Sequence, residues 1–278
     1  MPELPEVETV RRSLVPALVG KSITDVRVYM PKLLRNLTSD QFADQAVGRQ
    51  FVDIARRGKY LLFRLSGGYT LVVHLRMTGQ LRFAAPEDAV PKHTHIVLGL
   101  SCGKELRYTD IRQFGFWFFG RDADIDTISG MDKLGPEPLG DHFTVDYMLA
   151  HFKGRRGKLK ALLLDQRFVA GVGNIYADEA LFLSGLHPER TPCSITPAEA
   201  SRLHVALRDV LTAGVQLRGT TFSDYVDGLG LSGDFQSQLQ VYGRTGQPCR
   251  CCSGTVERIV VAGRGTHICS RCQLRMID

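Results

Sequence analysis

Four cysteines near the end of the chain limit the folds that this region can adopt. Two residues lie between Cys249 and Cys252 and two between Cys269 and Cys272, and 16 residues lie between the pairs. This spacing is typical of a structural zinc site, in which four thiolates complete a tetrahedron and leave no open position. The sequence therefore predicts one structural Zn²⁺ per chain. We expect residues 256–261 and 266–268 to form a hairpin that turns at residues 263–265.

Composition narrows the class of protein. The 278 residues suffice for more than one domain, and the formal charge of +6 with a pI of about 9.0 suits an anionic partner. No apolar run approaches the ~20 residues of a membrane span. The acidic start of the chain matches neither a signal peptide nor a transit peptide. Metal-spaced cysteines favour a reducing compartment over a disulfide framework, so we expect a cytoplasmic location and no membrane partner.

The first half of the chain has the pattern of one helix followed by β-structure. Val7, Val10, Leu14 and Leu18 share a face of a helix expected over residues 4–19, which Gly20 ends. Eight short alternating or apolar segments then predict strands at residues 23–29, 51–57, 60–65, 70–75, 81–84, 95–100, 104–110 and 114–119. Eight such strands indicate a β-sandwich.

Helical signals follow a Gly-, Pro- and Asp-rich stretch at residues 130–141, which has the composition of a linker. We expect helices at residues 144–151, 157–165, 173–186 and 196–217, with N-cap threonines at Thr144 and Thr196. Residues 219–233 are polar and glycine-rich without a period, which is typical of a mobile surface loop.

The start of the chain, MPELPE, allows two interpretations. Pro5 and Glu6 suit the entry of a helix, because a first-turn proline needs no N–H partner and an acidic side chain favours the positive end of the helix dipole. Alternatively, removal of Met1 would expose the secondary amine of Pro2, which is partly unprotonated at neutral pH and can act as a nucleophile. Glu3 beside it could then donate or accept a proton.

A glycine-rich turn, DQRFVAGVGNIY at residues 165–176, joins two of the expected helices. Gly171 and Gly173 permit a close approach of the backbone to an anion, and the helix that follows would aim N–H groups at a phosphate. Lys158 and Lys160 lie upstream on the preceding helix. The same pattern also suits a plain helix–turn–helix corner.

Six motifs, taken in chain order, are shared with one enzyme family. They are residues 2–10 (PELPEVETV), 57–60 (RGKY), 77–79 (MTG), 110–115 (DIRQFG), 171–176 (GVGNIY) and the four C-terminal cysteines. Together they resemble formamidopyrimidine-DNA glycosylase, the bacterial repair enzyme for 8-oxoguanine and ring-opened purines. The start LPEVET resembles this branch more than the endonuclease VIII branch, which prefers oxidised pyrimidines.

The resemblance implies an α+β multidomain fold. An N-terminal β-sandwich with an N-terminal helix would span residues 1–135. A helical helix–two-turn–helix domain would span residues 142–235, and a four-cysteine zinc finger β-hairpin residues 241–278. The partner would be damaged double-stranded DNA in the cleft between the domains, bound by a monomer without a redox or nucleotide cofactor.

The resemblance also implies roles for individual residues. Pro2 would be the nucleophile at the deoxyribose C1′, and Glu3 the acid that assists opening of the sugar ring. The further site residues are Lys59 and Arg264 as catalytic phosphate contacts; His93, Arg112, Lys160 and Asn174 for DNA binding; Met77, Arg112 and Phe114 to fill the gap left by the everted base; and Glu6 to support the active site. Taken alone, Arg264 could be a solvated turn residue and Met77 strand core.

The chemistry of base excision requires residues with the roles given to Met77, Arg112 and Phe114. A base inside a duplex is unreachable, so an enzyme that acts on it must flip it out at a cost of a few kcal/mol. Three alternatives stay open at this point: a non-catalytic zinc-ribbon protein that binds nucleic acid, a scaffold that has lost activity, and an endonuclease VIII-like enzyme that prefers pyrimidines.

Overall fold

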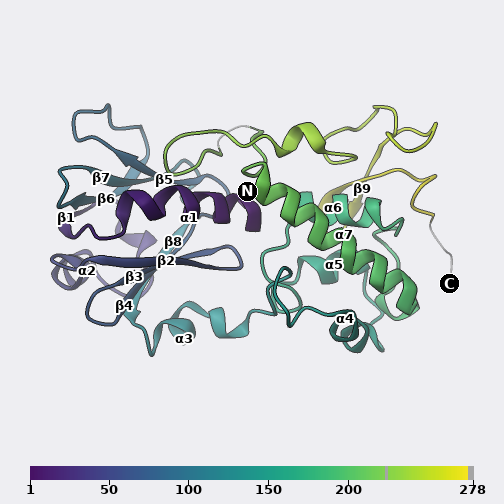
Figure 1. The fold of residues 1–278 in the computed structure, drawn as a ribbon, viewed down its shortest axis with the longest axis horizontal. Coiled ribbons are helices and arrows are strands. Elements are labelled where there is room, and N and C mark those ends of the chain that lie inside the picture. The colour runs from purple at the N-terminus through teal and green to yellow at the C-terminus, as the bar shows by residue number, and fades with distance from the viewer. Residues whose placement is uncertain (223–224, 275–278) are drawn as a thin grey trace. The chain divides into compact units, whose positions relative to one another are not determined.

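We describe residues 1–222 and 225–274 of a computed structural model (Figure 1). They group into two compact units, Met1–Lys133 with Leu217–Asp234 (unit 1) and Leu134–Gln216 with Phe235–Asp278 (unit 2). The three domains at residues 1–135, 142–235 and 241–278 stay a prediction. The structure groups residues 217–234 with the N-terminal unit rather than with the helices that precede them.

Unit 1 contains two antiparallel four-stranded sheets. One has the order β1 (Ile23–Val28), β6 (Thr94–Leu100), β7 (Glu105–Asp110), β5 (Gly79–Ala84). The other has the order β2 (Phe51–Arg57), β3 (Tyr60–Leu65), β4 (Tyr69–His74), β8 (Phe116–Arg121). The eight predicted strands and the sandwich are confirmed, with strand ends that differ by a residue or two.

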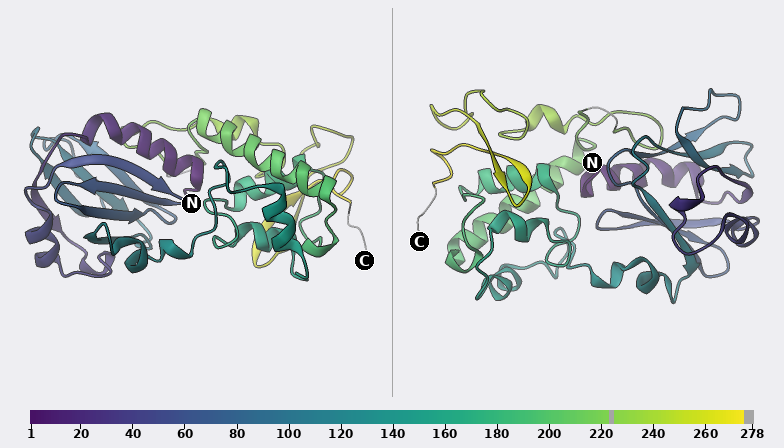
Figure 2. Two further views of the ribbon diagram at one scale, coloured as in Figure 1. Left: turned by 60° about the horizontal axis from the view of Figure 1, so that its bottom comes forward. Right: turned by 180° about the vertical axis from the view of Figure 1, so that it is seen from behind.

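Helix α1 (Leu4–Leu18) lies along the sandwich and contacts a strand of each sheet, β2 and β5 (Figure 2). The predicted face is the buried one, because Val7, Val10, Leu14 and Leu18 are each at most 1% exposed. Burying side chains of this size stabilises the fold by about 1.5–3 kcal/mol each. The helix therefore belongs to the core of the sandwich, which places the first residues of the chain at one edge of it.

Glu8, away from that buried face of α1, holds a cluster of arginines. Burial alone would raise the pKa of Glu8, but hydrogen bonds from Arg11 and Arg12 and the charge of Arg56 lower it to about 2. The carboxylate is therefore ionised throughout the neutral range and anchors β2 to α1.

Two short helices of unit 1 were not predicted: α2 (Ser39–Ala46) and α3 (Ile125–Ser129). The signal for α2 is present in the sequence, because Thr38 and Gln41 form a capping box at its start. Both units also contain 3₁₀ turns, at Pro31–Leu33 (η1), Met131–Lys133 (η2), Pro192–Ser194 (η3) and Phe235–Gln238 (η4).

Unit 2 holds the four predicted helices, observed as α4 (Val145–Phe152), α5 (Leu159–Leu164), α6 (Asn174–Leu183) and α7 (Pro197–Gln216). The hairpin is confirmed as β9 (Glu257–Val261) and β10 (Arg264–Ile268). Its turn was predicted wrongly at residues 263–265. Ala262 and Gly263 turn the chain with φ of 50° and 72°, the signs that a two-residue hairpin turn requires, so Arg264 already belongs to β10.

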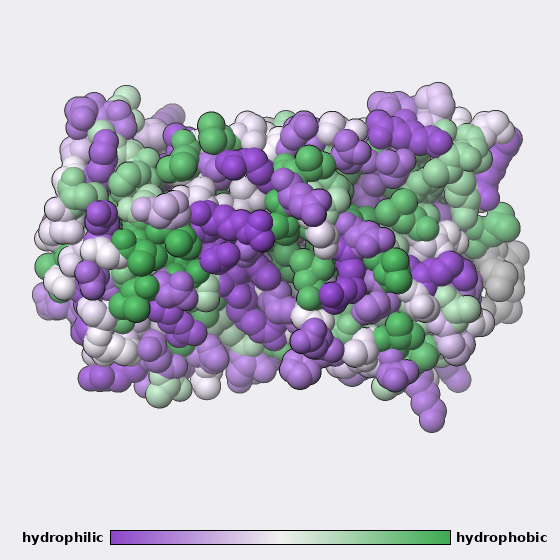
Figure 3. All heavy atoms as spheres, in the orientation of Figure 1, coloured by the Kyte–Doolittle hydropathy of each residue, from purple (hydrophilic) through white to green (hydrophobic). Residues whose placement is uncertain are grey.

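On the face drawn in Figure 3, hydrophobic residues lie in small groups among hydrophilic ones. Within residues 1–222 and 225–274, none of the helices combines the length and the apolar character needed to cross a bilayer.

Candidate active site and nucleic-acid interface

The N-terminal residues are enclosed at the start of α1. Glu3 precedes the helix as its N-cap residue and is 1% exposed, and Pro2 is buried, whereas Met1 is half exposed. Glu6 Oε2 accepts the Glu3 N–H at 2.8 Å, which satisfies a backbone donor that the helix cannot. The helix entry is thus confirmed, and it leaves a buried carboxylate beside Pro2 in the chain.

Glu6 also joins α1 to residues 217–234. Its Oε1 accepts the Thr220 N–H at 2.7 Å, and Tyr225 Oη donates to the Glu6 carbonyl at 3.2 Å. Farther along, Asp227 is fully buried and accepts the N–H groups of Leu229 and Leu231, both at 2.9 Å. The described residues of this segment have no regular secondary structure, as expected, and the hydrogen bonds to Glu6 join them to α1. Residues 223–224 of the predicted loop lie outside the described residues.

Lys59 lies in the turn between β2 and β3 and is only 7% exposed. His74, at the end of β4, is a neighbour that the sequence analysis missed. Burial, with the charges of Arg76 and Lys59, lowers the pKa of His74 to about 3, so its imidazole is neutral at neutral pH. Because His74 Nδ1 accepts the Arg76 N–H at 3.0 Å, the neutral ring carries its proton on Nε2. The Lys59 ammonium and the Nε2–H donor of His74 are therefore neighbours.

The three predicted void-filling residues come from two turns of unit 1. Met77 is 39% exposed and Phe114 is 50% exposed, so neither is strand core. The exposed Arg112 lies with its guanidinium 4.7 Å from the centre of the Phe114 ring. An exposed methionine, phenylalanine and arginine on neighbouring turns have the apolar and stacking surfaces that a wedge in a base stack needs.

Asp110, which the sequence analysis did not single out, joins these two turns. It is fully buried; its Oδ1 accepts from Thr78 Oγ1 at 2.5 Å and its Oδ2 accepts the Gly115 N–H at 2.8 Å. Thr78 Oγ1 in turn accepts the Arg112 N–H at 3.0 Å. The Asp110 carboxylate thus binds both Thr78, which follows Met77, and Gly115, which follows Phe114, and so fixes the two turns relative to each other.

His93 lies beside the same carboxyl end of β7. Its carbonyl accepts the Asp110 N–H at 3.1 Å, and its φ of 69° is rare for a residue with a side chain. The structure therefore places His93 next to the void-filling turns; its predicted DNA contact stays a prediction.

In unit 2, Asn174 lies against the residue that follows Arg264. Asn174 opens α6, and its Nδ2 donates to the Gly265 carbonyl at 3.0 Å. Arg264 precedes Gly265 and is exposed. The glycine-rich turn and the tip of the hairpin therefore meet, with a cation and a helix N-terminus side by side.

Lys160 is fully buried, which favours a supporting role over direct DNA contact. Its Nζ lies 2.5 Å from Asp178 Oδ1 and donates to Thr266 Oγ1 at 2.7 Å. Since Thr266 is on β10 and Asp178 on α6, Lys160 ties the strand that carries Arg264 to the helix that begins with Asn174.

The four cysteines fit a zinc ion. Their ligand atoms all lie within 4.8 Å of one another, with Sγ–Sγ distances of 3.8 Å for Cys249–Cys272 and 3.5 Å for Cys252–Cys269. Sulfurs bound at ~2.3 Å in a tetrahedron would be ~3.8 Å apart. The N–H groups of Cys251 and Gly254 point at Cys249 and Cys252 Sγ at 3.4 and 3.3 Å, which suits thiolates.

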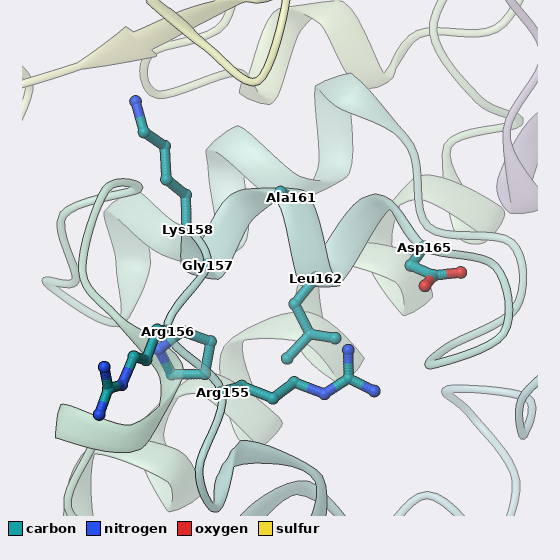
Figure 4. Close-up of a pocket in the computed structure, with 8 residues that line it drawn as sticks. Arg155, Arg156, Gly157, Lys158, Ala161, Leu162 and Asp165 are labelled. Atoms are coloured by element: carbon teal, nitrogen blue, oxygen red, sulfur yellow. The ribbon is translucent and has the colours of Figure 1, made fainter.

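A separate pocket of about 370 Å³ lies at the surface of unit 2 (Figure 4). Arg155, Arg156 and Lys158 line it, together with Asp165. Lys158 points away from the other labelled side chains and pairs with Glu189 at 2.5 Å. None of the predicted site residues lines this pocket.

Three family models match the chain in succession. They are the formamidopyrimidine-DNA glycosylase N-terminal domain at residues 1–117, the formamidopyrimidine-DNA glycosylase H2TH domain at residues 134–226, and a zinc finger found in FPG and IleRS at residues 246–275. Together they include the strands of both sheets except the end of β8, the helices α4 to α7 and the four zinc-spaced cysteines.

Relatives that match this chain over nearly its whole length belong to the same family as these models. Formamidopyrimidine-DNA glycosylases from Heliobacterium modesticaldum and Desulforamulus reducens are 51% and 49% identical, over 98% of this chain and 100% and 99% of theirs. A crystal structure of a Lactococcus lactis FPG mutant with Fapy-dG-containing DNA is 36% identical with a TM-score of 0.93, over 99% of this chain and 100% of that one. The chain belongs to the formamidopyrimidine-DNA glycosylase family.

Proposed function

We propose that this protein excises oxidised purines, 8-oxoguanine and formamidopyrimidines, from duplex DNA and then cleaves the strand at the abasic site. The observation that carries the proposal is the buried Glu3 carboxylate beside Pro2 at the start of α1. Relatives with the same fold were solved with Fapy-dG DNA and with abasic DNA, which supports the same class of substrate here.

The reaction begins at Pro2 after removal of Met1. The lone pair of the Pro2 nitrogen attacks C1′ of the damaged nucleotide, and the bond from C1′ to the base breaks with its electron pair going to the base. The proton that the Pro2 nitrogen then loses neutralises the departing base. Glu3 protonates the sugar ring oxygen as the ring opens, which leaves an iminium between Pro2 and C1′. This electron sink acidifies C2′–H, so loss of that proton expels the 3′ phosphate, and a second elimination expels the 5′ phosphate.

The remaining residues hold the DNA open. Met77, Arg112 and Phe114 fill the space of the everted base and offset the few kcal/mol that eversion costs. Lys59, Asn174 and Arg264 contact phosphates, with buried Lys160 behind the last two. Such contacts position the duplex without reading its sequence.

Zn²⁺ held by Cys249, Cys252, Cys269 and Cys272 ties the two cysteine pairs and so supports the hairpin that bears Arg264. The enzyme acts as a monomer and needs no redox or nucleotide cofactor. Because the substrate is chromosomal DNA, we place the protein in the bacterial cytoplasm.

The test is borohydride trapping on DNA that carries 8-oxoguanine opposite cytosine, followed by digestion and mass spectrometry. The adduct should be on the tryptic peptide of residues 2–11, PELPEVETVR, because it begins at the attacking nitrogen. A version with residues added before Pro2 turns that nitrogen into an amide without a usable lone pair. It should lose trapping and keep its zinc.

An adduct on an internal lysine peptide, such as one with Lys59, would overturn the assignment of Pro2. Absence of any adduct, with DNA binding intact, would favour a non-catalytic protein. Faster excision from DNA with an oxidised pyrimidine would favour the endonuclease VIII-like alternative.

A further inference from the structure

Asp178 is a buried charge in unit 2 to which none of the roles above has been given. It lies on α6 one turn after Asn174 and is fully buried. Its Oδ1 is 2.5 Å from Lys160 Nζ, and its Oδ2 accepts the backbone N–H of His267 at 2.9 Å and lies 3.3 Å from His267 Nδ1. The carboxylate therefore joins α6 to both α5 and β10.

These contacts are concentrated at the strand that begins with Arg264. Asn174 Nδ2 binds the Gly265 carbonyl, Lys160 Nζ binds Thr266 Oγ1, and Asp178 binds His267. Three consecutive residues of β10 are thus held from the side of α5 and α6.

The zinc site cannot hold this end of the strand by itself. The nearest cysteine ligand, Cys269, follows the last residue of β10, and Arg264 is the first. At ~3.3 Å per residue, the two are about 17 Å apart along the strand. The position of Arg264 relative to Asn174 therefore depends on contacts other than those of the cysteines.

We infer that Asp178 is a positioning residue for phosphate binding: through Lys160 and His267 it sets the place of Arg264 relative to Asn174. It does not touch DNA. The inference rests on the proposed function, in which Asn174 and Arg264 are the phosphate contacts of unit 2.

The test is Asp178→Asn, which keeps an oxygen for the His267 N–H but removes the charge opposite Lys160. A duplex with a reduced abasic analogue serves as the probe, and its affinity is measured as a function of salt concentration. We expect about a tenfold loss of affinity. The slope of log K against log[salt] should fall by about 0.9, the value for one lost phosphate contact, as for Arg264→Ala.

A double-mutant cycle separates positioning from general damage. If Asp178 acts through Arg264, Asp178→Asn should change affinity less than about twofold in an Arg264→Ala background. Equal losses with and without Arg264 would overturn the inference. Glu199→Gln is the control, because it breaks the partly buried Arg190–Glu199 pair of the same unit without touching β10 and should leave the slope unchanged.

Folding is checked by zinc content and circular dichroism. If Asp178→Asn does not fold because Lys160 is left as an uncompensated buried charge, Asp178→Asn with Lys160→Met removes both charges and should give the same reduced slope. An unchanged slope in that variant would refute the positioning role. A wild-type protein that fails to bind the probe would instead refute the proposed function.

Discussion

Replacing Asp110 by asparagine should uncouple the two turns that carry Met77 and Phe114. In the native protein one carboxylate oxygen accepts from Thr78 Oγ1 and the other from the Gly115 N–H. The asparagine side chain would keep one oxygen acceptor, and its NH₂ group would face the other donor. The Thr78 hydroxyl and the Gly115 N–H cannot both be accepted, because the NH₂ group is itself a donor.

The size of the effect follows from the burial of Asp110, which is 0% exposed. A hydrogen bond to a charged group contributes about 1.5–3 kcal/mol, and leaving a buried donor unsatisfied costs about 1–3 kcal/mol. We expect unfolding to become easier by about 2–4 kcal/mol. At about 2–4 °C per kcal/mol for a chain of this size, the melting temperature should fall by roughly 5–15 °C.

The functional loss should exceed the loss of stability. A displacement of a positioning group by 1 Å can cost about a hundredfold in rate, so single-turnover excision should fall at least about tenfold at a temperature where the variant is folded. Eversion, followed by 2-aminopurine fluorescence beside the lesion, should be impaired. Binding of undamaged DNA should change little, because the proposed phosphate contacts do not involve Asp110.

Asp122→Asn is a control for loss of a carboxylate that accepts from a threonine hydroxyl, because Asp122 Oδ1 accepts from Thr70 Oγ1 in the same unit, at an exposed position. It should leave excision unchanged. An Asp110→Asn variant that melts earlier but excises within twofold of wild type would show that the carboxylate only stabilises the fold and would refute the reasoning.

Four further outcomes are expected. Glu3→Gln should retain DNA binding and lose most base excision in single-turnover assays; unchanged excision would remove Glu3 from the mechanism. Chelation of zinc, or Cys269→Ser, should abolish DNA binding, and active protein without zinc by metal analysis would contradict this. Ala262→Gly should stabilise the protein by about 0.5–1 kcal/mol and so raise the melting temperature, because glycine adopts the φ of 50° at this turn residue without the strain of a side chain. A lower melting temperature would count against strain at this position. The pKa of Glu8 is lowered from 4.5 to about 2 in the folded state, so Glu8 stabilises the protein above pH 4.5 and loses this effect as the pH falls toward 2. The difference in unfolding free energy between wild type and Glu8→Gln, measured by denaturant titration, should therefore shrink over that pH range. A constant difference would refute the linkage.

Local patterns in the sequence were sufficient for most of the fold. Alternation with a period of two located the strands, and the buried face of α1 followed from the spacing of Val7, Val10, Leu14 and Leu18. The zinc site followed from two cysteine pairs. These features depend on neighbours in the chain, so they can be read without knowing what packs against them. The hairpin turn was placed wrongly because an alanine at positive φ has no sequence signal of its own.

The candidate site was predictable only where a motif carried it. Pro2 and Glu3 entered as one of two interpretations of the start of the chain, and the family resemblance then gave roles to them and to Lys59, Asn174 and Arg264. All of these roles stay predictions. The burial of Lys160 could not be inferred from the sequence. A lysine is stable in the interior only beside a neutralising group, and that group, Asp178, lies on another helix and meets Lys160 only in the folded chain.

What the sequence determined by itself is most of the helices and strands, the metal ligands and the family. What only the tertiary structure decided is how buried carboxylates connect them: Glu6 with Thr220, Asp110 with Thr78, and Asp178 with Lys160 and His267. The members of these sets are far apart in the chain, and each carboxylate is stable in the interior only because folding brings donors to it. No local pattern reports such a pairing, since its free energy comes from burial and from partners that meet only in the folded chain.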